Sequence, residues 1–206
     1  MFMKRNNNFL TIFLNNSYNF FFKKFNNISI DKSEKKKLIN KNIKSLNHST
    51  DLHTVWLLNL KKIYNLIKIN LDLKNYHFLD VGCGNGIPLI YAYKKFSFNT
   101  FSGFDIIPEY VKNSRKNIED SLNNKNINVF QADASEILLD DKSYFIFMFN
   151  PFDEIIMEEF IKNNYKNLLK NKSVIAYSNY RQLEVIKKFS KNIITIKRFK
   201  LAACFF

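Results

Sequence analysis

The chain has 206 residues, 46% of them hydrophobic, and carries a net charge of +14 from 32 lysines and arginines against 18 acidic residues. This length fits one domain of ordinary size with an extension, and the hydrophobic content excludes a chain that stays disordered. The two cysteines, Cys83 and Cys204, give neither a disulfide framework nor metal-ligand spacing, so we expect no metal site. No apolar run reaches the roughly 18 residues that span a bilayer, and we expect a cytoplasmic protein.

The basic excess belongs to the N-terminal third of the chain. Residues 1–75 carry 14 basic and 4 acidic residues, a net charge of +10, whereas residues 76–206 carry 18 and 14, a net charge of +4. A region of this charge fits attraction to nucleic acid or to an anionic membrane. The simpler interpretation is a lysine-rich solvated surface, which A/T-rich codons also favour.

Residues 1–30 contain no acidic residue. Two apolar clusters, 9–14 and 18–22, are separated by Asn15-Asn16-Ser17. The stretch lacks the long apolar core and the cleavage site of a secretory signal, and it is acid-poor but not arginine-rich as a transit peptide would be. We interpret it as an N-terminal extension, with a membrane-surface or targeting segment as the alternative.

Residues 31–75 are expected to form two helices. Ser33 is a candidate cap for a basic helix up to residue 47, whose apolar stripe is Leu38, Ile39, Ile43 and Leu46. A second helix is indicated by helical spacing of Trp56, Leu57, Leu60, Ile63, Tyr64 and Ile67. His48 and His53 flank the polar link between them, either as bases facing a pocket or as ordinary surface residues.

From residue 77 onward, apolar segments alternate with amphipathic ones. Strands are expected over 77–81, 100–104, 127–131, 144–149 and 173–178, with a closing pair over 192–197 and 201–206. Helices are expected over 88–96, 108–118, 153–169 and 181–189, with a short one after Asp133. This alternation predicts a mostly parallel sheet with helices on both faces.

One loop gathers three of the four glycines in the chain, at positions 82, 84 and 86. It follows an apolar run ending at Asp80 and precedes a helix that opens with Pro88, an arrangement that points backbone N–H groups at a ligand. The dinucleotide fingerprint requires a sixth-position glycine, where this chain has Ile87. The observed pattern, acid-x-Gly-x-Gly-x-Gly, resembles motif I of the class I S-adenosylmethionine (SAM) dependent methyltransferases.

The resemblance extends over about residues 77–190 and implies a three-layer, Rossmann-like α/β sheet with an α-helical N-terminal cap and SAM as the cofactor. It implies that Asp80 lies near the methionine end of SAM and that the backbone approaches SAM closely at Gly82, Cys83, Gly84 and Gly86. It also implies that helices over 31–75 cover SAM and shape the substrate pocket.

Two further acids follow the next two expected strands. Asp105, next to Ile106, stands 25 residues after Asp80 (105 − 80), where a carboxylate can accept hydrogen bonds from two ribose hydroxyls. Asp133, next to Ala134, resembles the family position that contacts the adenine amino group. The alternative for each acid is a helix cap.

Asn150-Pro151-Phe152 follows the fourth expected strand. It resembles the Asn-Pro-Pro-Tyr motif of methyltransferases acting on amide, amino or exocyclic nitrogens, in which the Asn side chain and the Pro carbonyl accept hydrogen bonds from the target NH₂. Here Phe152 replaces the second proline, so the alternative is a turn that only lines the pocket. The resemblance assigns the three residues to catalysis and Asn150 to SAM as well.

The sequence therefore predicts a SAM-dependent methyltransferase with residues 1–30 as extension, 31–75 as helical cap and 76–206 as the methyltransferase domain. The methyl acceptor is a protein, a nucleic acid or a small molecule, with nitrogen as the favoured atom. One rival is a nucleotide- or dinucleotide-dependent enzyme of the same fold class. The other is a non-catalytic SAM-fold binding module that acts through its basic N-terminal region.

Overall fold

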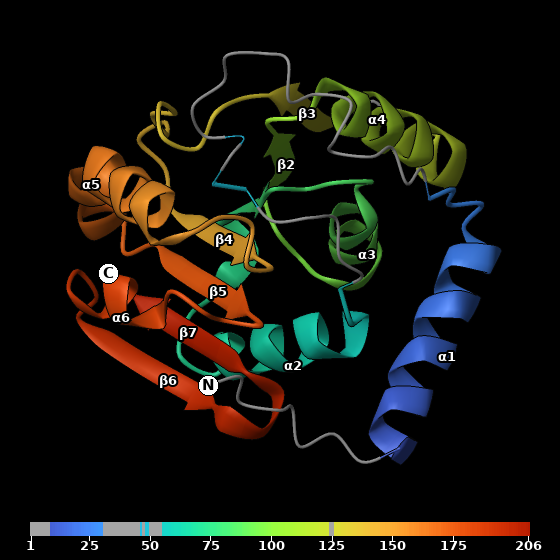
Figure 1. Cartoon of the computed structure of the whole chain (residues 1–206), viewed down its shortest axis with the longest axis horizontal. Coiled ribbons are helices and arrows are strands. Elements are labelled where there is room, and N and C mark those ends of the chain that lie inside the picture. The colour runs from blue at the N-terminus through green and yellow to red at the C-terminus, as the bar shows by residue number, and fades with distance from the viewer. Residues whose placement is uncertain (1–8, 31–45, 47, 50–54, 124–125) are drawn as a thin grey trace.

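The computed structural model describes residues 9–30, 46, 48–49, 55–123 and 126–206, and its centre is a seven-stranded sheet (Figure 1). The strand order is β3-β2-β1-β4-β5-β7-β6. The strands are β1 His77–Val81, β2 Thr100–Asp105, β3 Ile127–Gln131, β4 Tyr144–Met148, β5 Val174–Ser178, β6 Asn192–Ile196 and β7 Leu201–Phe205. The first five run parallel, while β7 pairs antiparallel with both β5 and β6. The expected strands are confirmed, with ends that differ by at most one residue.

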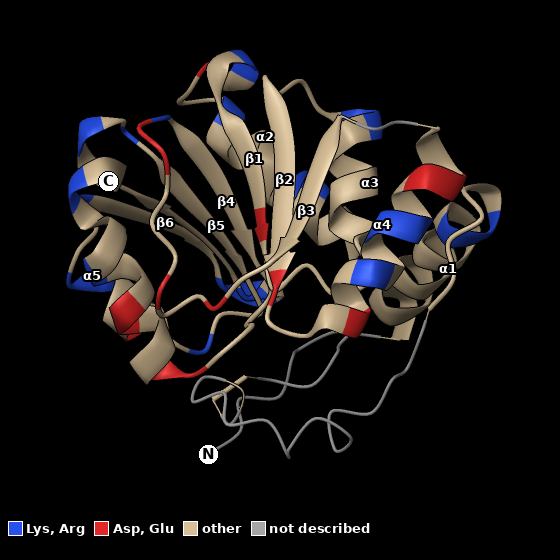
Figure 2. Cartoon of the chain, turned by 90° about the horizontal axis from the view of Figure 1, so that it is seen from above, with Lys and Arg blue, Asp and Glu red and all other residues tan. Residues whose placement is uncertain are grey.

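Helices cover both faces of the sheet (Figure 2). The cluster on one face includes α2 Leu57–Lys68, α3 Ile87–Lys95 and α4 Pro108–Leu122, and the cluster on the other includes α5 Glu154–Lys170 and α6 Leu183–Lys187. Short 3₁₀ turns, η3 Leu73–Asn75 and η4 Lys197–Phe199, precede β1 and β7. The predicted three-layer α/β architecture is therefore confirmed.

β4 shows why the sheet is central. All five of its residues are buried, and they alternate between the two core clusters, with Phe145 and Phe147 in one and Ile146 and Met148 in the other. A parallel strand buried on both faces needs such a continuous apolar run.

The expected short helix after Asp133 is wrong, because residues 134–136 form only a turn. The backbone of the segment after this turn is hydrogen-bonded by side chains of α5 and not by its own N–H and carbonyl groups. Asn164 donates to the Ile137 carbonyl (3.0 Å) and accepts from the Leu139 N–H (2.7 Å), and Asn167 donates to the Leu139 carbonyl (2.7 Å). These amide side chains satisfy the groups that a helix would have paired.

α1, Phe9–Phe25, is a continuous helix where the sequence indicated two apolar clusters and a polar break. The break disappears because Asn15 and Asn19 lie on the buried side of the helix. Asn15 donates to the Thr11 carbonyl (2.7 Å), one turn earlier. Asn19 accepts from the Leu57 N–H (3.1 Å) and so caps α2, whose own N-cap residue Trp56 makes no side-chain capping bond.

The helix expected over 56–67 is confirmed as α2, whereas the basic helix expected over 33–47 falls almost wholly outside the described residues, as does His53. α2 packs on β5, β7 and α3, within the helical layer of the sheet. The division at residues 30 and 75 stays a prediction. Among the described residues, no helix has the length and apolar character needed to cross a membrane.

Candidate active site

The loop between β1 and α3 is built from glycines in left-handed backbone conformations. The φ angles of Gly82, Gly84 and Gly86 are +72°, +52° and +74°. A Cβ on Gly82 would stand 2.7 Å from the Cβ of Pro151, and one on Gly86 would collide with the hydroxyl of Ser114. The loop therefore needs glycine both for its conformation and for the close approach of its neighbours.

Asp105, at the end of β2, ties this loop to the next turn. Its Oδ2 accepts from the Gly84 N–H and its Oδ1 from the Ile107 N–H, each at 3.0 Å. Burial raises the pKa of Asp105 to about 6, while these backbone N–H bonds act in the opposite direction. Each carboxylate oxygen keeps a further lone pair for a ligand hydroxyl. Ile106 lies between Asp105 and Ile107 in this turn.

Asp80, at the end of β1, is 2% exposed, and its Oδ2 has no hydrogen-bond partner in the part of the chain that the structure describes. Burial raises the pKa of Asp80 well above its ordinary value, and the nearby charge of Asp105 adds to this. Cys83 is buried beside the two acids, and its thiol pKa is also raised by burial first and by their charges second. A buried carboxylate without a partner is costly, so this position fits a donor or cationic group of a ligand such as the SAM ammonium.

At the end of β3, Asp133 forms a turn with its own backbone. Its Oδ1 accepts from the Ser135 N–H (2.9 Å) and hydroxyl (2.7 Å), and Ala134 is buried. Oδ1 of Asp133 thus caps a turn rather than a helix, and the role of Asp133 toward the adenine stays a prediction. In the described part of the chain, no hydrogen bond joins Asp133 to the glycine loop.

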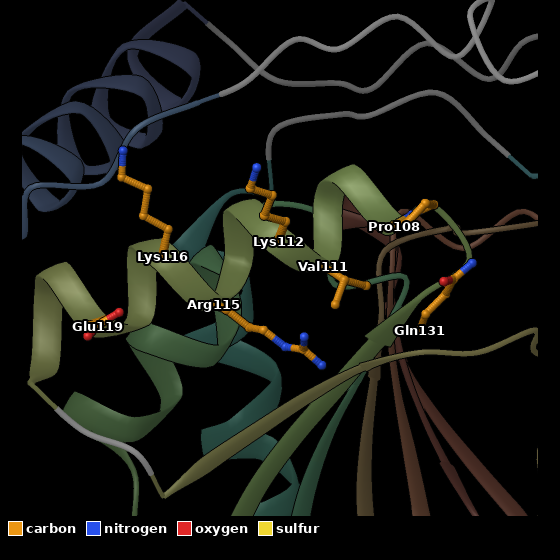
Figure 3. A pocket seen from close by; sticks show the side chains of 7 residues that line it. All are labelled: Pro108, Val111, Lys112, Arg115, Lys116, Glu119 and Gln131. Atoms are coloured by element: carbon orange, nitrogen blue, oxygen red, sulfur yellow. The ribbon is translucent and has the colours of Figure 1, made fainter.

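A groove of about 530 Å³ runs between α4 and β3 (Figure 3). It begins near Pro108 and Gln131, which follow β2 and end β3, so it adjoins the Asp105 side of the site. Three of its seven lining residues are basic, and one of these, Arg115, also donates to the Val129 carbonyl at 2.8 Å. The lining residues are Pro108, Val111, Lys112, Arg115, Lys116, Glu119 and Gln131.

At the end of β4, Asn150 is 3% exposed and has a φ of +47°. The hydroxyl of Tyr177, at the end of β5, donates to Asn150 Oδ1 (3.1 Å) and accepts from the Arg181 and Gln182 N–H groups (3.3 Å each). Sequence reasoning missed Tyr177. The available signal was a hydroxyl at the carboxyl end of an otherwise apolar strand.

Phe152 packs under the helix that follows it, and its role toward a ligand stays a prediction. Its side chain is 5% exposed, and the ring belongs to the core cluster under α5, with its centroid 6.5 Å from that of Phe160. The structure therefore gives this ring a packing role, because the apolar side chain is buried under the helix that follows.

Residues 48–49 lie against the same turn. His48 Nδ1 is 2.5 Å from Asp153 Oδ2, the Asp153 N–H donates to the His48 carbonyl (2.9 Å), and Ser49 forms a bridge with Phe152. Asp153 Oδ1 accepts from the Ile155 and Ile156 N–H groups and so caps α5. A role of His48 as a base stays a prediction.

Taken together, the contacts join the glycine loop, Asp105 and the Asn150-Pro151 turn at one edge of the sheet, where ligands of open α/β sheets bind. Among the described residues, no group of three or more His, Cys, Asp or Glu side chains forms a metal site. The unpartnered oxygen of Asp80, the glycine loop and the buried carboxylate of Asp105 have the chemistry that fits SAM.

Comparison with known proteins agrees with this geometry. The family model of the methyltransferase domain matches residues 72–203. The precorrin-6y C5,15-methyltransferase of Geobacter metallireducens GS-15 has a similar structure, with TM-score 0.55 and 17% identity over 77% of this chain and 92% of that one. The ribosomal protein L11 methylase of Lactobacillus delbrueckii subsp. bulgaricus gives TM-score 0.51 and 17% identity over 72% and 77%.

A third similar structure, SMU.472, is a complex with SAH, with TM-score 0.51 and 13% identity over 70% of this chain and 51% of that one. No curated protein sequence matches the chain. At these identities the solved structures show the fold alone. The family follows from the match to the domain model, which covers more than half of the chain. The chain belongs to the methyltransferase domain family and is a SAM-dependent methyltransferase with a Rossmann-like fold.

Proposed function

We propose that this enzyme transfers the methyl group of SAM to a nitrogen acceptor, on a protein or a nucleic acid, held at Asn150 and Pro151. The observation that carries the proposal is the contact between the two halves of the site. Pro151 lies so close to Gly82 that no Cβ fits between them. An acceptor bound at this turn is then adjacent to a cofactor bound at the loop, which is the positioning that methyl transfer needs.

The residues proposed for SAM divide by the part of the molecule they would hold. Asp80 faces the ammonium group, because its unpartnered oxygen needs a donor. Asp105 and Ile106 hold the ribose, and Asp133 and Ala134 hold the adenine. The loop backbone at Gly82, Cys83, Gly84 and Gly86 follows the methionine portion, and Asn150 borders it. SAM supplies the methyl group already activated by its sulfonium.

The acceptor side depends on two oxygens. Asn150 Oδ1 accepts a hydrogen bond from Tyr177, and we propose that this oxygen also faces the N–H group of the methyl acceptor. The Pro151 carbonyl is the second proposed acceptor of a hydrogen bond from the same NH₂ group. Phe152 contributes packing rather than an aromatic surface, so orientation of the nitrogen depends on Asn150 and Pro151. In this proposal residues 76–206 form the methyltransferase domain, and residues 31–75 form a cap beside this turn.

The test is methyl transfer from labelled SAM to separate pools of protein, RNA, DNA and metabolites, followed by identification of the methylated atom. We expect label on nitrogen in a macromolecular pool. We expect Asn150→Ala to lower the transfer rate on the order of a hundredfold, because the acceptor loses its orientation, with SAM affinity within about twofold of wild type. Asn123→Ala is the matched control, since Asn123 also has a left-handed φ of +47° but ends α4.

Methylation of oxygen or carbon, or an Asn150→Ala variant as active as wild type, would contradict the proposal that a nitrogen atom held at Asn150 is methylated. Label found only in the metabolite pool would remove the macromolecular acceptor. A nucleic-acid acceptor also predicts binding that weakens steeply with salt.

A further inference from the structure

α1 packs Tyr18 and Phe22 against the core but leaves most of its large apolar side chains on its outward side. Its buried side chains are Asn15 and Asn19, each 4% exposed. Its outward side carries six large apolar side chains whose exposed fractions run from 53% to 84%. We call these six the α1 apolar face: Phe9, Leu10, Phe13, Phe20, Phe21 and Phe25. A helix that only covers a domain turns its apolar side to the core, so this face requires another explanation.

Polar contacts on the inner side fix the orientation of α1. Asn19 donates to the Val55 carbonyl (2.6 Å) and accepts from the Leu57 N–H (3.1 Å). The hydroxyls of Tyr18 and Tyr91 are 3.2 Å apart. Rolling the helix to bury its phenylalanines would break these bonds and uncap α2. The apolar face is therefore a fixed part of the surface.

The chain that follows α1 is also hydrogen-bonded to the sheet domain. The Ser29 N–H and hydroxyl both donate to the side-chain oxygen of Asn117, each at 3.0 Å, and Asn117 donates in turn to the Ser29 carbonyl (2.9 Å). Asn117 is fully buried in α4. The middle of α1 and the chain that follows it are thus joined to the sheet domain.

The exposed rings form two groups along the helix, which together make an apolar strip. The rings of Phe9 and Phe13 stack with centroids 6.4 Å apart, and those of Phe21 and Phe25 stack at 6.2 Å. Phe20 meets Phe21 edge to face at 5.5 Å. Contiguous exposed apolar surface of this kind marks a binding surface on a folded protein.

The ends of α1 and α3 near this strip are basic, whereas α4, whose Ser121 contacts the Asn26 carbonyl, carries Glu119 and Asp120. Residues 1–30 contain no acidic residue, and the last turn of α1 carries Lys23 and Lys24. Lys94 and Lys95, both exposed, end α3 one turn after Tyr91, which contacts the inner side of α1. An apolar strip with lysines beside it complements a partner that has an apolar interior beneath an anionic outer surface.

The shape favours a flat partner over a groove. α1 lies on the outside of the molecule, beyond α3 (Figures 1 and 2). A single helix with phenylalanines outward and lysines at its border has the composition of helices that lie in the plane of a membrane interface, with their apolar side about 5–10 Å deep. We infer that the α1 apolar face binds the surface of an anionic lipid bilayer, with the flanking lysines at the lipid phosphates.

The test is co-sedimentation of the full chain with vesicles of phosphatidylcholine alone and of phosphatidylcholine mixed with phosphatidylglycerol. We expect binding to the mixed vesicles, weaker binding to the neutral ones, and release by added salt. The variant Phe13→Ser/Phe20→Ser/Phe21→Ser should bind at least about tenfold more weakly, since it loses buried apolar area. Leu138→Ser is the matched control, because Leu138 is 73% exposed in the loop before β4.

Thermal unfolding and SAM titration of each variant verify that the fold is intact, and they make this inference independent of the proposed acceptor. Absence of binding to phosphatidylglycerol vesicles, or equal binding by the triple variant, would overturn the inference. So would a dimer, measured by sedimentation without lipid, that the triple variant alone abolishes, because the face would then join two copies of the chain.

Discussion

The two halves of the carboxyl edge of the sheet are built differently. On the β1–β3 side the site is formed largely by backbone. It has three glycines in left-handed conformations, and the N–H of Gly84 donates to Asp105, 21 residues later in the sequence. On the β4–β5 side it is formed by side chains from distant segments. Tyr177 reaches Asn150 across 27 residues, and His48 reaches Asp153 across 105. We propose that the first half binds the cofactor and that the second half selects the acceptor.

The largest effect is expected from breaking the backbone half. Gly86→Ala places a methyl group against Ser114 at a φ of +74°. We expect the free energy of unfolding to fall by about 3 kcal/mol from strain and overpacking together. Urea unfolding followed by circular dichroism measures it. Asn123→Ala, which changes a left-handed residue at the end of α4, should cost about 1 kcal/mol; equal losses in the two variants would contradict the crowding argument.

This half was also the more predictable one. The glycine spacing, Asp80 and Asp105 are short-range features, because each lies at the end of a strand whose apolar pattern is clear. Tyr177, Asp153 and His48 come together only through the sheet order and the chain path before α2, which residue spacing does not encode. For Phe152 the motif predicts a ligand contact, and the spacing of residues does not indicate that its ring also packs under α5. α1 was missed because asparagines normally mark exposed breaks.

The affinity for SAM is expected to depend on pH through Asp105. The pKa of Asp105 is raised to about 6 by burial, and ribose hydroxyls donate to its ionised form, so affinity is full above that pKa and falls below it. Between about pH 7 and about pH 5, the affinity for SAM should drop on the order of tenfold. Fluorescence or calorimetric titration measures it. In Asp105→Asn the dependence should be shallower, and affinity that rises toward acid would contradict the assignment.

A smaller effect is expected on the side-chain half. Tyr177→Phe removes the hydroxyl that donates to Asn150, which should slow methyl transfer about fivefold, or about 1 kcal/mol, without changing the affinity for SAM. Single-turnover transfer at saturating SAM measures this. Tyr180→Phe is the matched control, from the segment just after β5. A change in SAM affinity with unchanged transfer would show that Tyr177 belongs to the cofactor half instead.

The most direct test of the account is calorimetric titration of the chain with SAM, beside Asp105→Ala. We predict binding in the micromolar range, roughly −8 kcal/mol, and on the order of a hundredfold loss in the variant, because hydrogen bonds to a charged group are lost. Absence of heat and of thermal stabilisation with SAM, together with binding of a nicotinamide dinucleotide, would contradict it.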